Sequence, residues 1–459
     1  MPGETFIWRS RLPFPAEQVF DWHMRPGAFE RLCPPWEQVQ VIRRDEPFGE
    51  GSRVELLMRT GPFRQRWIAE HREFIPGRQF RDIQVSGPFR QWEHTHRMEP
   101  DGPDACFLED RIEYRLPGGA VGAAVAGSAV RRRLERTFQY RHQVTARDLE
   151  LENSRTKVKN MRVAISGASG LVGTALIASL LRAGHQPVRM VRRQSSGSEP
   201  TISWNPEAHY VDAQALEGID AIVHLAGEGI ADGRWTPQRK ARIRDSRVQG
   251  TRLLCETLAQ MANPPRIFIC ASAVGFYGDR GDEVLDETSS PGNSFLATLC
   301  KDWEESTEPA RRKGIRVANL RLGVILSPKS GALAKMLLPF KMGVGGVVGS
   351  GRQYLSWIVL DDVVGSIEHV LGNETLSGPI NVTAPHPVTN TEFTMTLGKV
   401  LGRPTIFPMP AFAARLAFGE MAEEMLLGGA KVIPSRLQQS GYQFQQPELE
   451  SGLRSLLGK

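Results

Sequence analysis

The stretch Met161-Arg-Val-Ala-Ile-Ser-Gly-Ala-Ser-Gly-Leu-Val-Gly173 decides the fold of this chain. Its first half, Arg162–Ser166, has the apolar composition of a buried strand. The segment Leu171–Arg182 that follows predicts an amphipathic helix, which ends before Gly184. Three glycines stand between the two elements. A strand joined to a helix by a glycine-rich turn is the opening unit of a dinucleotide-binding sheet.

Each of the three glycines has a physical role in such a unit. Gly167 permits the tight turn out of the strand, Gly170 lets the backbone approach a phosphate, and Gly173 lets the helix pack closely on the sheet. The N-terminus of the helix adds N–H groups and a favourable dipole for an anion. An ordinary strand–turn–helix unit is the alternative. The segment therefore predicts a pyrophosphate cradle made of Gly167, Ala168, Ser169, Gly170, Leu171, Val172 and Gly173.

From Met161 onward, predicted strands and helices alternate along the chain. Strands at 221–226 and 266–271 are apolar throughout, as expected of strands that are covered on both faces. This order predicts an α/β fold, a Rossmann-type doubly wound parallel sheet. The expected elements are strands 163–166, 187–191, 221–226, 266–271 and 317–322, and helices 171–182, 236–260 and 294–313.

The first 150 residues are different in style, because they contain no lysine and are rich in aromatic residues. Helices are expected near Pro15–Trp22 and over 120–150, and alternating segments between them predict antiparallel strands at 53–58, 64–73, 79–85, 91–98 and 107–114. The polar segment 151–160 lacks periodicity, which is typical of a linker. We therefore expect an α+β domain over 1–150, a linker over 151–160, and the Rossmann domain with a C-terminal substrate subdomain over 161–459.

Composition limits the classes of function. The net charge of +6 is spread along the 459 residues, and the run Arg131–Arg136 is best explained as a solvated helix face, so we expect no nucleic-acid partner. The five cysteines are scattered without metal-ligand spacing, which predicts no metal site and a reducing compartment. No signal peptide or bilayer-spanning stretch is evident, so we expect a cytoplasmic protein that does not insert into membranes.

The end of the second predicted strand, Arg189-Met-Val-Arg-Arg193, bears on the choice of cofactor. In a dinucleotide fold this point meets the adenosine ribose, where a carboxylate selects NAD and arginine favours the 2′-phosphate of NADP. We therefore predict NADP(H), held first by Arg192 and second by Arg193, with NAD as the other possible cofactor. Two surface arginines at a strand end are the alternative.

Several further segments occur together and in order: 166–173, 191–193, 224–227, 246–251, 271–278, 321–326, 357–363, 381–385 and 434–442. Together they resemble the extended short-chain dehydrogenases/reductases, and in particular the atypical branch called epimerase family proteins. The resemblance covers essentially residues 161–459. It implies an NAD(P)-dependent oxidoreductase or epimerase-like activity on a small molecule, and it extends the cofactor contacts to Leu225, Ala226, Gly227, Glu228, Thr251 and Ala271.

The wider family uses a serine, a tyrosine and a lysine four residues after the tyrosine for proton transfer. Ser272 matches the serine, with a structural serine at a strand end as the alternative. When Glu304 is aligned with the family's acidic residue, Leu296 and Cys300 stand at the tyrosine and lysine positions, and Tyr277 is the nearest phenol. Two hypotheses follow: an enzyme that uses Ser272 and Tyr277, or a non-catalytic protein that binds or senses NADP(H).

Residues 1–150 resemble the helix-grip fold of the START, polyketide-cyclase and Bet v 1-like superfamily. The features that carry this resemblance are Phe14–Phe20, Gly49–Arg53 before a strand, and the long closing helix. In that fold a curved sheet wraps around the last helix and leaves an apolar cavity between them, which implies an apolar or lipid-like ligand. A lipid carrier is therefore a third hypothesis. The tryptophans Trp8, Trp22, Trp67 and Trp92 either line this cavity or fill a core.

Overall fold

The computed structural model describes residues 3–60, 63–154, 160–192 and 200–459. Internal contacts divide the chain into two compact units, which consist mainly of residues 1–158 and of residues 159–457. Each unit is described by itself. Within the described part of the chain, every helix is too short or too polar to span a bilayer.

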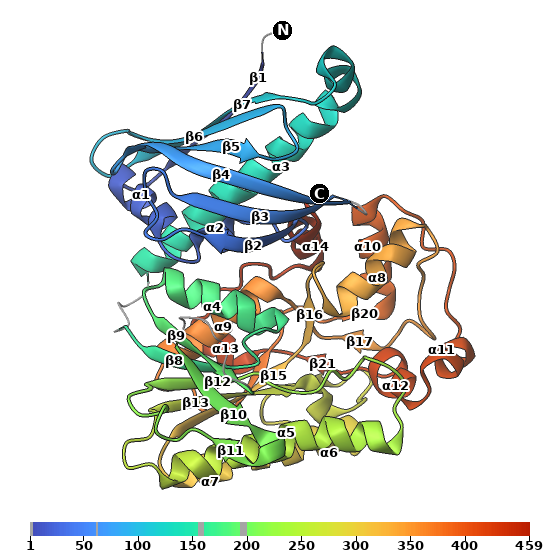
Figure 1. Cartoon of the computed structure of the whole chain (residues 1–459). Helices are drawn as coiled ribbons and strands as arrows, with labels where there is room; N and C mark the ends of the chain where they lie inside the picture. The colour runs from blue at the N-terminus through green and yellow to red at the C-terminus, as the bar shows by residue number, and fades with distance from the viewer. Residues whose placement is uncertain (1–2, 61–62, 155–159, 193–199) are drawn as a thin grey trace. The chain divides into compact units, whose positions relative to one another are not determined.

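Within its described residues, the first unit is an antiparallel sheet combined with three helices. Its strand order is β1-β7-β6-β5-β4-β3-β2. Figure 1 shows this sheet curving over the long helix α3. The elements are β1 (Glu4–Leu12), α1 (Ala16–Met24), α2 (Ala28–Leu32), β2 (Gln38–Arg44), β3 (Arg53–Thr60), β4 (Phe63–Ile75), β5 (Gln79–Ser86), β6 (Gln91–Pro100), β7 (Cys106–Arg115) and α3 (Gly119–Ser154).

The alternation of buried and more exposed side chains along the strands explains why these segments form a sheet with one face in the core. In β6 and β7 every second side chain is buried, so one face of each strand lies in the core and the other meets solvent. The inward residues pack on α3 through Phe138 and Val144. All five predicted strands are present, and α3 extends four residues into the segment for which a linker is expected. The rest of that segment up to residue 159 lies outside the described residues.

The second unit contains the predicted alternation of strands and helices. Its first part comprises β8 (Arg162–Ser166), α4 (Leu171–Arg182), β9 (Gln186–Val191), β10 (Thr201–Asn205), η1 (Pro206–Ala208), β11 (Tyr210–Val211), β12 (Ala221–His224), α5 (Pro237–Gln260), β13 (Ile267–Ala273), η2 (Val274–Tyr277), β14 (Val284–Leu285), α6 (Phe295–Glu305), α7 (Glu308–Arg312) and β15 (Arg316–Leu322). The second part comprises β16 (Val324–Leu326), α8 (Gly331–Lys341), β17 (Tyr354–Leu355), β18 (Trp357–Val359), α9 (Leu360–Gly372), β19 (Gly378–Val382), β20 (Val388–Thr389), α10 (Asn390–Leu401), α11 (Ala411–Phe418), α12 (Glu420–Ala422), η3 (Glu423–Leu427), β21 (Lys431–Val432), α13 (Ser435–Gln439) and α14 (Leu449–Leu457).

The main sheet has the order β11-β10-β9-β8-β12-β13-β15-β19. Its pairs are parallel except for β11, which is antiparallel to β10. Helix α4 covers one face, and α5 and α6 cover the other (Figure 1). The predicted doubly wound sheet is therefore confirmed. Strand order reverses between β8 and β12, and in open α/β sheets a ligand binds at such a switch point.

One predicted helix is wrong in extent. The expected helix 294–313 is two helices, α6 and α7, separated at Ser306 and Thr307. The hydroxyl of Ser306 donates to the Trp303 carbonyl and that of Thr307 donates to the Glu304 carbonyl. These bonds, together with Pro309, which has no N–H to donate, end the first helix.

Candidate cofactor and active site

The glycine turn lies at the switch point of the sheet. Gly167 follows β8 with a positive φ of 68°, which disfavours any residue with a side chain. A Cβ at this position would lie 2.8 Å from the carbonyl carbon of Leu225 and 2.9 Å from the nitrogen of Ala226. Gly167 therefore brings the ends of β8 and β12 together.

The other two glycines differ in the space around them. A Cβ on Gly173 would lie 2.3 Å from the Gly167 carbonyl oxygen, so α4 packs on the turn only without a side chain there. A Cβ on Gly170 would meet the same oxygen at 3.2 Å, a milder contact. Ser169 and Gly170 are exposed, while Ala168 is buried. The turn thus presents exposed backbone at the start of a helix, which suits a phosphate.

A buried hydrogen-bond network supports the turn from below. Ser166 Oγ lies 2.7 Å from His224 Nδ1 and accepts hydrogen bonds from the backbone N–H groups of Leu225 and Ala226. Burial lowers the pKa of His224 to about 4. The imidazole is therefore neutral near pH 7, and its role is to tie the ends of β8 and β12 together.

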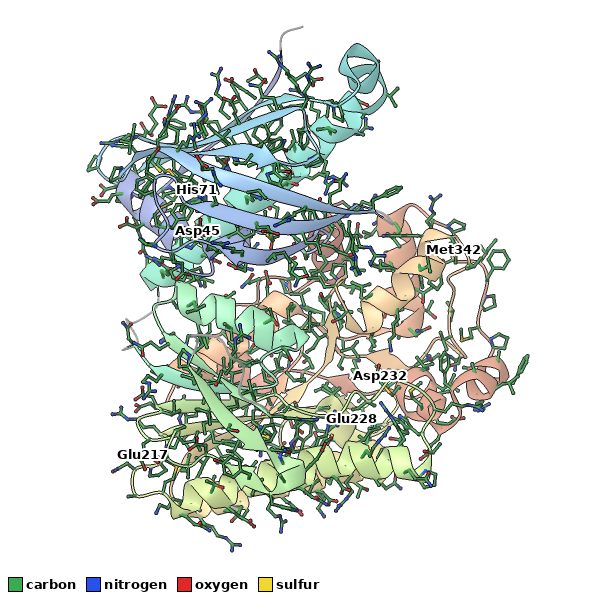
Figure 2. All side chains as sticks on the ribbon, viewed as in Figure 1. Asp45, His71, Glu217, Glu228, Asp232 and Met342 are labelled. Atoms are coloured by element: carbon green, nitrogen blue, oxygen red, sulfur yellow. The ribbon has the colours of Figure 1, made fainter. Side chains whose placement is uncertain are left out.

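The segment after β12 adds a charged region to the same edge. Glu228 and Asp232 lie on it (Figure 2). The backbone N–H of Glu228 donates to Ser246 Oγ at 3.1 Å, and its carboxylate pairs with Arg239 at 3.1 Å. Glu228 is therefore engaged by α5, while Gly227 beside it is exposed.

Arg247 was not among the predicted site residues, although it falls in the quoted segment 246–251. Its guanidinium lies so close to Gly227 that a Cβ there would be 3.1 Å from the guanidinium carbon. The side chain is buried, and burial lowers its pKa to about 10. Arg247 Nη1 donates to the Ile243 carbonyl at 3.1 Å, but among the described residues the side chain forms no ion pair and its Nε has no hydrogen-bond partner. A buried cation of this kind suits an anionic group of a ligand.

The predicted NADP-selective arginines are only partly described. Arg192 follows β9 and is exposed, with its Nη1 3.6 Å from Glu207 Oε1. Such an exposed pair is weak, so the guanidinium can turn to another anion. Arg193 lies outside the described residues.

The predicted catalytic pair is joined by a buried ionic network. Ser272, at the end of β13, donates to Glu304 Oε1 at 2.7 Å. Glu304 accepts two hydrogen bonds from Arg321, each of 2.9 Å. Arg321 also donates to the hydroxyl oxygen of Tyr277 at 2.9 Å. The structure thus brings Ser272 and Tyr277 into one network.

The hydroxyl groups of Ser272 and Tyr277 are both engaged in hydrogen bonds. Tyr277 is completely buried, and its oxygen lies 2.7 Å from Asn381 Oδ1 and 2.8 Å from the Asp286 carbonyl oxygen. Burial raises the pKa of Tyr277 to about 12, despite the nearby Arg321. Ser272 is also buried, with its proton directed to Glu304. Neither hydroxyl faces open solvent in this arrangement.

The positions aligned with the family's tyrosine and lysine lie close to the same segment. A Cβ on Gly275 would lie 3.2 Å from the Leu296 Cβ and 4.0 Å from Cys300 Sγ. Burial raises the pKa of the Cys300 thiol to about 12, so it remains protonated. Leu296 and Cys300 therefore present an apolar wall where the family has its acid.

Two other predicted cofactor contacts lie in the core. Thr251 is completely buried, and its hydroxyl accepts a hydrogen bond from Trp303 Nε1 at 2.9 Å. Ala271, in β13, is also buried. The structure does not bring Thr251 to the surface of the glycine turn, whereas Leu225 and Ala226 border it.

The first unit has a hollow of about 270 Å³ of its own. None of the four tryptophans lines it: Trp22 is packed in one hydrophobic cluster, and Trp8, Trp67 and Trp92 lie in another. These four side chains thus pack in hydrophobic clusters and do not line this hollow. The hollow is lined by His23, Met24, Arg25, Pro26, Phe29, Arg44, Glu46, Pro47, Phe48, Val54 and His71.

Comparisons with known proteins agree with the two units. Residues 163–382 match the NAD dependent epimerase/dehydratase family, and residues 12–141 match the polyketide cyclase / dehydrase and lipid transport family. Residues 409–456 match a domain of unknown function. An epimerase family protein of Mycobacterium bovis is 47% identical over 285 residues, which are 62% of this chain and 94% of that protein. The chain belongs to the epimerase family.

Other members of the epimerase family extend this similarity. The human epimerase family protein SDR39U1 is 36% identical over 302 residues, which are 65% of this chain and all of that protein. Its crystal structure with NADPH superposes with a TM-score of 0.59 at 34% identity, covering 65% of this chain and 99% of that one. A nucleoside-diphosphate sugar epimerase of Corynebacterium glutamicum has a TM-score of 0.80 at 32% identity and covers 99% of this chain and 90% of its own.

Proposed function

We propose that the second unit binds NADPH at the glycine turn between β8 and α4, and that the chain is an NADPH-dependent oxidoreductase or epimerase-like enzyme acting on a small molecule. The observation that carries this proposal is the close approach at Gly167, where the ends of β8 and β12 meet at the switch point of the sheet. Human SDR39U1, a relative that was crystallised with NADPH, supports the choice of cofactor.

In this proposal the cofactor lies along the carboxyl edge of the sheet. The pyrophosphate meets the turn 167–173 and the N-terminus of α4. Arg192, together with Arg193, binds the 2′-phosphate. The segment Leu225–Glu228 lines the cofactor, and the buried guanidinium of Arg247 below Gly227 supplies positive charge beside it.

The reaction is proposed as hydride transfer or epimerisation that depends on Ser272 and Tyr277. A second candidate, non-catalytic binding or sensing of NADP(H), is favoured by a specific observation. Both hydroxyls are buried and engaged with Glu304, Arg321 and Asn381. Catalysis therefore requires a substrate that displaces one of these hydrogen bonds.

We also propose that residues 1–150 form a module for an apolar or lipid-like ligand, joined by the segment 151–160 to the epimerase module of 161–459. The hollow lined in part by Phe29, Phe48 and Val54 supports this proposal, because most of its lining surface is apolar. A cytoplasmic location is part of the proposal. It is supported by the five cysteines, all within the described residues, which form no disulfide.

Cofactor titration tests the first proposal. The full chain is titrated with NADPH and, separately, with NADH, and binding is followed by nicotinamide fluorescence. We expect saturable binding of one NADPH per chain, at least tenfold tighter than NADH. Absence of saturable binding by either nucleotide contradicts the proposal.

Isotope exchange separates the two candidate functions. The chain is incubated with NADPH deuterated at C4 and a panel of ketones, aldehydes and keto sugars linked to nucleotides, each of which has a carbonyl that can accept the deuteride. Transfer of deuterium to any substrate, lost in Ser272→Ala, supports the enzyme. Tight NADPH binding without transfer across the panel supports the non-catalytic alternative.

The ligand of the first unit has its own test. Native mass spectrometry of the full chain after incubation with mixed fatty acids and aromatic compounds is expected to detect one bound molecule. Val54→Trp, which fills the hollow, is expected to abolish the adduct. Ile42→Trp, an exposed position of the same unit, is the matched control. An adduct that survives Val54→Trp contradicts a ligand in this hollow.

A further inference from the structure

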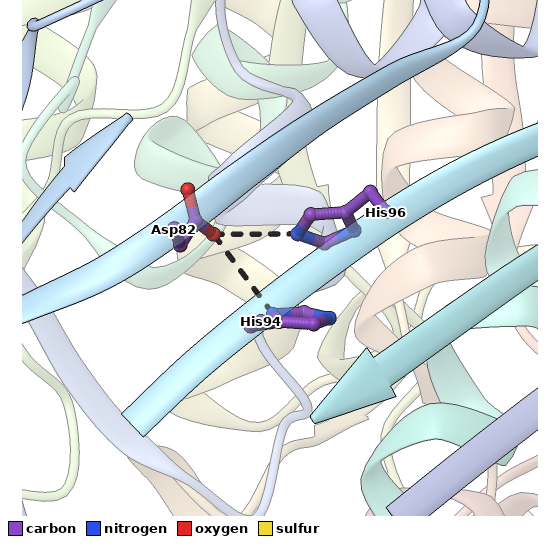
Figure 3. A group of neighbouring side chains, drawn as sticks. All are labelled: Asp82, His94 and His96. Atoms are coloured by element: carbon purple, nitrogen blue, oxygen red, sulfur yellow. Dashed lines mark hydrogen bonds and ion pairs between the residues drawn. The ribbon is translucent and has the colours of Figure 1, made fainter. Parts of the chain in front are cut away.

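The first unit contains a buried cluster of imidazole and carboxylate groups that the proposed function does not use. Asp82 on β5 and His94 on β6 are direct partners in the register of the two strands, and His96 lies two residues further on the same face. Figure 3 shows the Asp82 carboxylate turned toward both imidazole rings. One potential ligand atom from each of the three residues lies within 4.8 Å of the others.

The distances between the Asp82 oxygen and the histidine nitrogens suit a metal ion. Asp82 Oδ2 lies 3.3 Å from His96 Nε2 and 3.9 Å from His94 Nδ1. Two ligands of a tetrahedral ion with bonds of about 2.0–2.1 Å stand roughly 3.3 Å apart. Only a small movement of His94 is therefore needed for all three groups to bind one ion.

A second carboxylate contacts both rings. Asp110 on β7 lies 2.7 Å from His94 Nε2 and 2.7 Å from His96 Nδ1. A buried carboxylate accepts hydrogen bonds, so His94 Nε2 carries the proton when that ring is neutral, and His94 Nδ1 directs its lone pair toward Asp82. His96 contacts Asp82 through Nε2, in a hydrogen bond of 3.3 Å that a bound metal ion would replace. Histidine that ligates a metal commonly donates its other N–H to a carboxylate in this way.

His71 contacts the other carboxylate oxygen of Asp82. Its Nδ1 lies 3.0 Å from the carbonyl oxygen of Ser52, which only accepts, so Nδ1 carries a proton. Its Nε2 lies 3.0 Å from Asp82 Oδ1. In the neutral ring this places a second lone pair, besides that of His94, against the carboxylate. A cation between them would stabilise converging acceptors of this kind.

One divalent ion fits this group of donors. The rings of His94 and His96 are only 3.8 Å apart between centroids, close enough for both to reach the same ion. One divalent ion balances Asp82 and serves the lone pairs at once. Phe80, stacked on His96 at 4.1 Å, and Phe138, edge-on to His94 at 5.2 Å, hold the rings in place and exclude water.

We propose that Asp82, His94 and His96 bind a divalent first-row transition metal ion, with Asp110 orienting both histidines. Two histidines and one carboxylate leave coordination positions open, as sites that act on a ligand do. His71 contacts Asp82 and also lines the hollow of this unit. In this proposal an ion and a ligand reach the site from the side of the hollow, past His71.

Metal titration of the full chain tests this proposal. Untagged protein is stripped with chelator and titrated with Co²⁺ as a spectroscopic probe and with Zn²⁺ in a calorimeter. We expect one ion per chain with a micromolar or tighter Kd, and Co²⁺ absorption bands typical of nitrogen and oxygen ligands. Failure of both ions to bind the folded chain overturns the proposal and leaves a network held by protons.

Matched variants locate the ion. Asp82→Asn and His96→Gln are expected to weaken Zn²⁺ binding at least tenfold, and Asp110→Asn, a positioning residue, to weaken it tenfold to a hundredfold. Asp104→Asn, the same change at an exposed aspartate of the same unit, is expected to bind as the wild type does. If a variant fails to fold, the wild-type zinc X-ray absorption spectrum decides, because it counts imidazole ligands directly. Unchanged binding in folded Asp82→Asn and His96→Gln, or a spectrum without imidazole, overturns the proposal.

Discussion

Ser272 directs its hydroxyl proton to Glu304 at a distance of 2.7 Å, and Glu304 is held in turn by Arg321. The serine that corresponds to the family's catalytic serine is thus part of a buried ionic network. The strength of that network decides how readily a substrate displaces the Ser272 hydroxyl.

Glu304→Gln is expected to destabilise the protein far more than Ser272→Ala. Removal of the serine hydroxyl costs one hydrogen bond to a charged group, about 2 kcal/mol. Removal of the carboxylate leaves the Arg321 guanidinium, only 4% exposed, without a counter-charge, which costs about 3–5 kcal/mol. Urea unfolding measures both changes, with Ser451→Ala at an exposed site as the control. Equal losses in the two variants contradict the network described above.

Gly170→Ala is expected to weaken NADPH binding at least tenfold while it leaves the fold intact. The added methyl group stands 3.2 Å from the Gly167 carbonyl, a contact that a small shift relieves, but it occupies space through which a phosphate approaches. Gly250→Ala in α5, where a Cβ makes only ordinary contacts from 3.5 Å, is the matched control. Fluorescence titration together with thermal unfolding separates binding from stability. Unchanged affinity in Gly170→Ala places the phosphates elsewhere.

Arg192→Glu is expected to weaken NADPH binding about tenfold or more, which corresponds to about 1.4 kcal/mol. Binding of NADH is expected to change little, because NADH has no 2′-phosphate. The arginine is exposed, so its substitution leaves the core untouched. Arg312→Glu, an equally drastic change of an exposed arginine on α7, controls for the altered net charge. A parallel loss of affinity for both nucleotides would argue against contact with the 2′-phosphate.

The features that were predicted correctly from the sequence are local. The turn between β8 and α4 follows from three glycines in one short segment, and the strands of both units follow from periodicity within single segments. The break between α6 and α7 was missed because the side-chain bonds of Ser306 and Thr307 competed with a helical pattern that continued beyond them.

The ionic networks could not be predicted from the sequence, because they depend on how strands pair. Glu304 meets Ser272 and Arg321 only after α6 packs against β13 and β15. Asp82 and His94 are twelve positions apart in the chain, and only the register of β5 and β6 makes them partners. A weak signal was present in the alternation of His94 and His96, which places both on one face of a strand.

Arg247→Met is expected to weaken NADPH binding about tenfold with a change in the free energy of unfolding of no more than about 1 kcal/mol. Methionine keeps the packing on Trp303 and removes a buried charge that forms no ion pair among the described residues. Arg316→Met is the contrasting variant, because Arg316 donates to four backbone carbonyls and has a structural role. We expect it to lose stability and keep NADPH affinity. The reverse pattern would assign Arg247 a purely structural role.

His224 is expected to make the second unit less stable as the pH falls from about 6.5 to 4. Burial lowers its pKa from 6.5 in the unfolded chain to about 4 in the folded protein. Between these values the unfolded state binds more protons, so the free energy of unfolding decreases by up to about 3 kcal/mol as the pH falls. Above pH 6.5 none of this stability is lost, because the imidazole is neutral in both the folded and the unfolded state.

His224→Asn removes this titration and keeps an acceptor beside Ser166. Urea unfolding at several pH values between 4.5 and 7.5 is expected to give a wild-type curve that falls toward acid more steeply than that of the variant, and subtraction cancels all other titrating groups. His209→Asn, at an exposed position of the same unit, is expected to keep the wild-type slope. Equal slopes for wild type and His224→Asn would mean that the buried imidazole accepts a proton in the folded state and that the tie between β8 and β12 does not depend on its neutrality.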